Sequence, residues 1–77
     1  MHAAQVADEL SRREQALRRL PLPYSLALRL RDAGITADVI CEYVNVERVA
    51  LYGLYRMAEA KLVAAQEATD ERYHGRQ

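Results

Sequence analysis

Few side chains in this sequence are of the types that catalyse reactions or bind metal ions. The chain has 77 residues with one cysteine, Cys41, and two histidines, His2 and His74, near opposite ends. No Ser, Thr or Cys is arranged with a base as an activated nucleophile would be. A single cysteine excludes an internal disulfide, and neither it nor the histidines form a metal-ligand spacing. We therefore expect no enzyme activity, no cofactor, no metal and no small-molecule ligand.

Arginine side chains are the remaining candidates for binding, because guanidinium groups contact the phosphates of nucleic acids. The pairs Arg12–Arg13 and Arg18–Arg19 lie near the N-terminus, and Arg48 and Arg56 follow in the second half. The two pairs can equally contact acidic residues of a partner. They can also form a solvated face, balanced by the nearby acids Asp8, Glu9 and Glu14.

The net charge of zero hides an uneven distribution. Residues 1–31 hold six Arg against three acids, whereas residues 32–71 hold eight acids against three basic residues. Binding to nucleic acid depends mainly on neutralising phosphates. An acidic middle is therefore a weak electrostatic basis for a DNA contact.

These side chains must be positioned by a small domain with an aliphatic core. Hydrophobic residues make up 51% of the chain, but it contains neither Trp nor Phe. At this length a single core is only marginally adequate. We expect residues 1–77 to form one domain that gains stability from a partner or from a second copy.

No segment is predicted to enter a membrane. The longest apolar run, residues 49–55, is far too short to span a bilayer. The N-terminus also lacks the apolar segment of a secretory signal. A cytoplasmic setting is expected.

The first half of the chain is predicted to form two helices. Residues 3–19 carry apolar side chains close to helical spacing with charges between them. Pro21 and Pro23 end that helix. The second helix, "YSLALRLRDA", is expected to pack through Leu26, Leu30 and Ala33, with Leu28 beside them. Gly34 follows where a left-handed residue ends a helix.

The second half is predicted to form two more helices. Thr36 caps a short third helix, "ADVICEYV", whose first turn holds Asp38. Asn45 suits the left-handed residue of a tight turn. A long fourth helix then runs from about Glu47 to Thr69, and residues 70–77 form a flexible tail. The expected fold is all-α, with four helices and a helix-turn-helix formed by the last two.

Residues 20–62 resemble region 4 of bacterial sigma factors, especially the extracytoplasmic-function type, and are similar to the helix-turn-helix of LuxR-type regulators. The likeness lies in the spacing of apolar residues. The matching residues are Leu20-Pro21, Leu30-Arg31-Asp32, Gly34-Ile35-Thr36, Ile40, Cys41, Val44, Val46, Ala58, Ala60, Lys61 and Leu62. The resemblance implies a DNA-reading fourth helix and a role in bacterial transcription.

The fourth helix departs from that pattern at the positions that would face DNA. Those families carry Ser, Thr, Lys and Arg there. This chain instead holds Glu47, Ala50, Leu51, Tyr52, Gly53 and Leu54, and Met57 and Glu59 replace Arg. The scaffold is thus similar, whereas the DNA-reading side chains are altered.

On a helical wheel the fourth helix has two apolar sides. Leu51, Tyr55, Ala58 and Leu62 fall in one sector, expected to pack on the other helices, with Leu54 at its edge. The opposite side carries a ridge of little bulk that permits close approach of another helix, formed by Val49, Gly53, Met57, Ala60 and Ala64. The predicted contact residues are Val49, Tyr52, Gly53, Arg56, Met57 and Ala60.

Two functions are consistent with these features. The first is a transcription-regulating module that acts by self-association, or by binding a sigma factor, an anti-sigma factor or RNA polymerase. The second is a dimeric regulator that binds DNA directly through Arg48, Tyr52 and Arg56, with Arg12 and Arg13 on phosphates. A relic of the fold without its former function, or a purely structural assembly subunit, is a third possibility. An ordinary solvent-exposed position, without a partner, is also compatible with four residues: Ala60, Ala64, Tyr43 and Tyr52.

Overall fold

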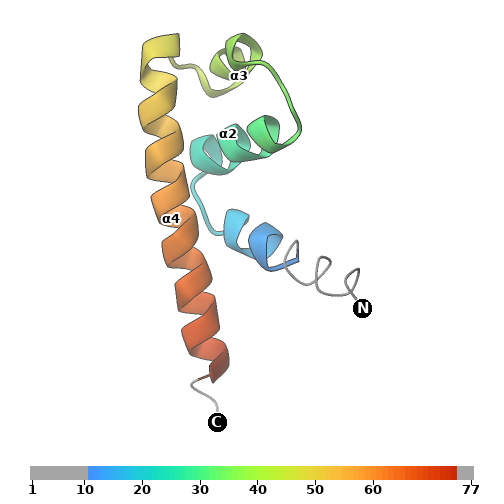
Figure 1. Cartoon of the computed structure of the whole chain (residues 1–77), viewed down its shortest axis with the longest axis vertical. Helices are drawn as coiled ribbons and strands as arrows, with labels where there is room; N and C mark the ends of the chain where they lie inside the picture. The colour runs from blue at the N-terminus through green and yellow to red at the C-terminus, as the bar shows by residue number, and fades with distance from the viewer. Residues whose placement is uncertain (1–10, 75–77) are drawn as a thin grey trace.

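The computed structural model describes the backbone of residues 11–74 and the side chains of residues 11–68. The first helix, described over residues 11–17, is followed by α2 (Leu22–Asp32), α3 (Ala37–Val44) and α4 (Arg48–His74). No strand occurs between residues 11 and 74, so the predicted all-α fold with a long last helix is confirmed. Figure 1 shows α4 running along one side of the molecule, with the shorter helices packed against it.

The first helix ends two residues earlier than the predicted residue 19. The backbone N–H groups of Arg19 and Leu20 donate to the carbonyls of Ala16 and Leu17, at 3.0 and 3.1 Å. These bonds span three residues and tighten the last turn. Pro21 then adopts an extended conformation, with ψ at 147°, which turns the chain into α2. The predicted residues 3–10 of this helix lie outside the described part.

The end of α2 confirms the role predicted for Gly34, whose φ of +81° lies in the left-handed region. Its N–H donates to the carbonyl of Arg31, and the N–H of Ile35 donates to the carbonyl of Leu30, both at 3.0 Å. These two bonds form a Schellman motif, which requires a left-handed residue.

The packing face predicted for α2 is only partly right: Leu30 packs against the core as expected, but Ala33 does not, and Ala27 was missed. Leu26 and Leu30 are only half-buried and Ala33 is exposed, whereas Ala27 and Leu28 are fully buried. The reason is that α2 packs on two sides. Leu28 joins a cluster with the first helix and α4, and Ala27 joins another with α3 and α4.

The turn from α3 to α4 occupies residues 45–47, which gives helix-turn-helix proportions. Asn45 is left-handed, with φ 58° and ψ 51°, as predicted. Thr36 stands at the first capping position of α3, but its hydroxyl makes no capping hydrogen bond. That part of the prediction is wrong. The carboxylate of Asp38, in the first turn, instead accepts a hydrogen bond from Arg48 at 2.8 Å.

The fourth helix extends further than predicted. It begins at Arg48 and continues to His74, so residues 70–74, assigned to a flexible tail, are helical. Between Leu54 and His74 there is no Gly or Pro to interrupt the helix. The loss of apolar periodicity after Thr69 does not stop it. Residues 75–77 lie outside the described part.

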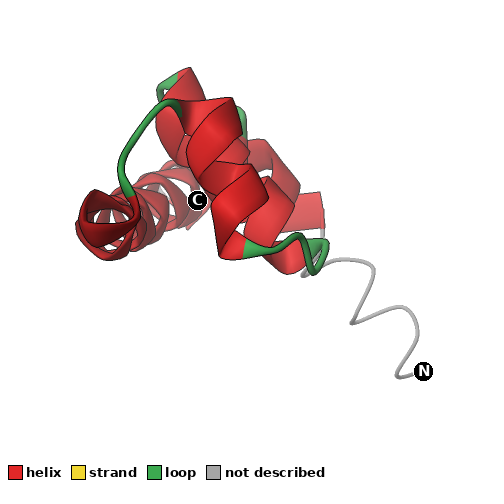
Figure 2. Ribbon diagram, turned by 90° about the horizontal axis from the view of Figure 1, so that it is seen from above, coloured by secondary structure: helices red, strands yellow, loops and turns green. Residues whose placement is uncertain are grey.

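The core consists of two clusters that share α4. The first contains Ala16, Leu17, Leu20, Leu28, Ala58 and Leu62. The second contains Ala27, Ile40 and Leu51, with Cys41 and Leu54 packed against it. Tyr55 contacts both clusters. The inward face predicted for α4 is therefore confirmed. In Figure 2, as in Figure 1, the shorter helices lie to one side of α4.

Candidate protein-contact surface on α4

The side of α4 that faces away from the core carries large apolar side chains in solvent. Val49 is 83% exposed, Tyr52 is 77% exposed and Met57 is 53% exposed. Gly53, Arg56, Ala60 and Ala64 are exposed beside them. Val63, 49% exposed, was not among the predicted contact residues. Its spacing could have revealed it, because it follows Ala60 by three residues and Arg56 by seven. We call this surface the outer face, defined as Val49, Tyr52, Gly53, Arg56, Met57, Ala60, Val63, Ala64 and Glu67.

Gly53 has no visible structural role within the described residues. A Cβ placed on it would meet none of their atoms within 4 Å, and its backbone conformation is one that any residue adopts. Glycine inside a helix costs about 0.5–1 kcal/mol relative to alanine. The helix is therefore less stable at Gly53 than it would be with alanine. The open space beside Gly53 allows close approach by a group outside the described residues.

Arg56, like Arg12 and Arg19, has no carboxylate partner among the described residues, whereas the other five described arginines each have one. It is exposed, and it lines a shallow, open hollow together with Arg31, Tyr52, Tyr55 and Glu59. Its guanidinium is therefore available to an acidic group outside the described chain.

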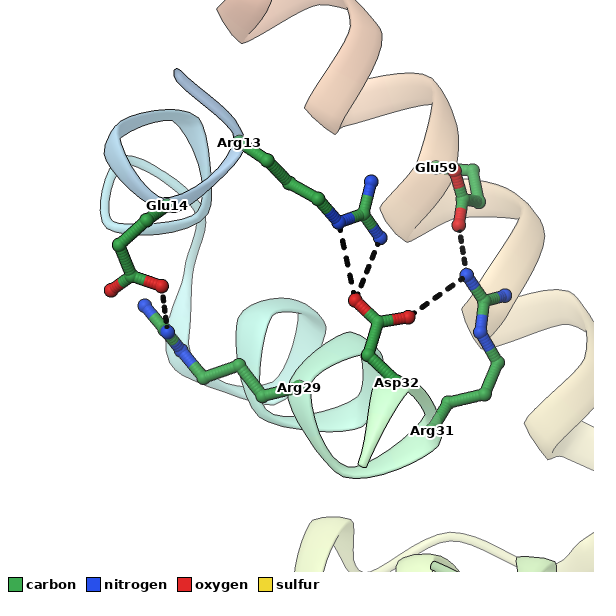
Figure 3. A network of polar contacts seen from close by, with 6 residues as sticks. All are labelled: Arg13, Glu14, Arg29, Arg31, Asp32 and Glu59. Atoms are coloured by element: carbon green, nitrogen blue, oxygen red, sulfur yellow. Dashed lines mark hydrogen bonds and ion pairs between the residues drawn. The ribbon is translucent and has the colours of Figure 1, made fainter. Parts of the chain in front are cut away.

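The neighbouring Arg31 is held in an ion-pair network that links three helices (Figure 3). Arg31 donates a short hydrogen bond to Glu59 of α4 and lies 3.9 Å from Asp32. Arg13 of the first helix donates to the same Asp32 from two nitrogens, at 3.0 and 3.1 Å. The Arg31 guanidinium also lies 5.1 Å from the centre of the Tyr55 ring. These contacts fix how the first helix and α2 sit on α4.

A second set of ion pairs holds the first helix to α2. Glu14 accepts hydrogen bonds from Arg29 and from Arg18 of its own helix. The hydrogen bond from Arg29, helped by Arg18, holds the pKa of the Glu14 carboxyl below its ordinary value. The same bond raises the pKa of Arg29.

The residues predicted for the DNA-binding alternative do not form one basic surface. Arg48 is paired with Asp38 at the start of α3, and Arg13 is paired with Asp32 at the end of α2. Arg12, Tyr52 and Arg56 are exposed. Two of the four arginines thus face carboxylates, which reduces the charge they can offer to phosphates.

The other side chains considered for function occupy ordinary positions. Cys41 is half-buried against the second core cluster. Tyr43 is 65% exposed on α3. Among the described residues no group of His, Cys, Asp and Glu is placed to hold a metal ion. No helix in that part of the chain combines the length and the apolar character needed to cross a bilayer.

Comparison of the chain with protein-family models, with curated proteins and with solved structures gives no significant match.

Proposed function

We propose that this chain is a helix-turn-helix module of the sigma-region-4 type that regulates transcription through protein contact on the outer face of α4. The proposed setting is the bacterial cytoplasm. The partner is a component of the transcription machinery, such as a sigma factor, an anti-sigma factor or RNA polymerase, or a second copy of this chain.

The observation that carries the proposal is the chemistry of the outer face. In the families that the sequence resembles, this side of the fourth helix reads DNA. Here it presents Val49, Tyr52, Met57 and Val63 to solvent, each at least 49% exposed. Tyr and Met are enriched in protein interfaces, and contiguous exposed apolar surface marks contact sites.

The proposal predicts that Gly53→Arg abolishes the protein contact without unfolding the chain. The space around Gly53 is open, so the new side chain fits the isolated molecule, and Arg is a better helix former than Gly. It places a long charged group on the outer face, between Val49 and Met57. Affinity for immobilised bacterial RNA polymerase holoenzyme, and the mass of the chain in solution, are the two quantities to measure.

The matched control is Ala33→Arg, which adds the same side chain at an exposed position at the end of α2. We expect it to change neither quantity. Circular dichroism should show equal helicity in both variants. If Gly53→Arg leaves both the polymerase affinity and the mass unchanged, the protein-contact proposal is wrong.

Direct DNA binding is the second candidate, favoured by Arg56, which is exposed beside Tyr52 and makes no ion pair with a described residue. It predicts that a labelled duplex of random sequence gains fluorescence anisotropy when the chain is added at low salt. Arg48→Ala and Arg56→Ala should each weaken that binding. Absence of binding at low salt, where phosphate contacts are strongest, would exclude this candidate.

A further inference from the structure

We infer that the outer face of α4 binds the same face of a second copy of this chain, with the two α4 helices antiparallel and related by a two-fold axis between Ala60 and Val63. This inference rests on the protein contact proposed above and identifies the bound partner as a second copy of the chain. It is carried by the charges along the outer face and by the small residues between them.

Four exposed residues form a single stripe at the middle of α4. Arg56, Ala60, Val63 and Glu67 follow one another at steps of four, three and four. With 3.6 residues per turn, they fall within a sector of roughly 60°. This sector lies opposite the buried Leu51, Ala58 and Leu62, so none of the described helices covers it.

The two charges of the stripe are complementary, and neither is paired within the described part of the chain. Arg56 and Glu67 are exposed, and neither makes an ion pair with another described residue. They are three helical turns apart, about 16 Å along the axis, which is too far for them to pair with each other. Each is therefore open to an opposite charge on another molecule.

An antiparallel arrangement brings these charges together twice. With the two-fold axis between Ala60 and Val63, Arg56 of each copy lies opposite Glu67 of the other. Ala60 of each copy lies opposite Val63 of the other. A parallel pair would instead place Arg56 against Arg56 and Glu67 against Glu67, and like charges across an interface are repulsive. The charge pattern thus selects the antiparallel arrangement.

The small residues allow the helices to come close. Ala60 is at the centre, Gly53 and Ala64 flank it, and a small side chain opposite Val63 leaves room for the larger one. Open space at the Cβ position of Gly53 agrees with a neighbour that is not part of this chain. Because the shorter helices lie to one side of α4, they do not block such a neighbour (Figures 1 and 2).

Charge reversal tests the pairing directly. The full-length chain and its variants Arg56→Glu, Glu67→Arg and Arg56→Glu/Glu67→Arg are compared by sedimentation equilibrium. We expect the wild-type chain to dimerise and each single variant to raise the dimer dissociation constant at least about tenfold, because two like-charge contacts replace two ion pairs. The double variant should return it to near the wild-type value, since the two pairs re-form with their charges exchanged.

Arg19→Glu and Glu42→Arg are the matched controls, because both positions are exposed, lie off α4 and make no ion pair among the described residues. We expect neither to change dimerisation. A wild-type chain that is monomeric at every concentration would overturn the inference, and so would a double variant that stays as weak as the single ones.

Affinity for immobilised RNA polymerase holoenzyme distinguishes failure of the antiparallel dimer from failure of the proposed function. A monomeric chain whose binding to the holoenzyme is lost in Gly53→Arg overturns the antiparallel dimer alone, and the outer face then binds the transcription machinery. A monomeric chain whose Gly53→Arg variant binds the holoenzyme as the wild type does would overturn both.

Discussion

At the scale of single residues, identical side chains differ according to what the fold places beside them. Arg48 and Arg56 are both exposed on α4, yet Arg48 is paired with Asp38 and Arg56 has no partner among the described residues. Asp38 and Arg48 meet because the left-handed Asn45 folds α3 back towards the start of α4. Neither helix propensity nor helical spacing predicts that Asp38 and Arg48 will pair. The sequence could place both arginines on the fourth helix, but it could not say which one is available.

Gly53 gives a prediction at the same scale. Because the position is helical and its surroundings are open, Gly53→Ala should raise the free energy of unfolding by about 0.5–1 kcal/mol. Urea denaturation followed by circular dichroism, at protein concentrations low enough to favour the monomer, measures the change. A variant that is no more stable than the wild type would mean that the glycine has a role inside the chain.

At the scale of helices, the left-handed turn residues and the inward face of α4 were predictable, whereas the buried face of α2 and the end of α4 were not. Gly34 and Asn45 were predicted to be left-handed because the backbone chemistry of a turn is local, and both are. The buried face of α2 was predicted only in part because a helix packed between two clusters buries residues such as Ala27 that lie between its apolar stripes. The end of α4 was placed too early because apolar periodicity ceases before the helix does.

The attachment of the first helix to α2 leads to a prediction about pH. Hydrogen bonds from Arg29 and Arg18 depress the pKa of Glu14 in the folded chain. A depressed carboxyl pKa stabilises the fold above the unfolded value of about 4.3, and this stabilisation is lost as the pH falls through the lower, folded value. Glu14→Gln should therefore reduce stability more at pH 7 than at pH 3.

Urea midpoints of the wild type and of Glu14→Gln at the two pH values measure this difference. Glu42→Gln serves as the control, because Glu42 is exposed on α3 and makes no ion pair with a described residue. Its midpoint should follow that of the wild type at both pH values. An equal loss of stability for Glu14→Gln at pH 7 and pH 3 would assign Glu14 a role in packing rather than in charge.

At the scale of the whole molecule, one helix serves both the core and the surface. The inward side of α4 contributes Leu51, Ala58 and Leu62 to the two core clusters. Its outer face presents apolar side chains and the complementary charges of Arg56 and Glu67 to solvent. The two sides could be separated from the sequence because helical spacing alone divides them. Val63 lies on the outer side by its spacing, three residues after Ala60, but it was not among the contact residues predicted from the sequence.

The central claim is that the outer face binds protein, and hydroxyl-radical footprinting read by mass spectrometry tests it most directly. The oxidation rates of Tyr52 and Met57 are measured in dilute and in concentrated protein, with RNA polymerase holoenzyme, and with a random-sequence duplex. Leu22, 71% exposed at the start of α2, reports on a surface outside the contact. We predict that concentrated protein or holoenzyme protects Tyr52 and Met57 while Leu22 is oxidised as before. Protection of Tyr52 and Met57 by the duplex alone, or by none of these additions, would contradict the claim.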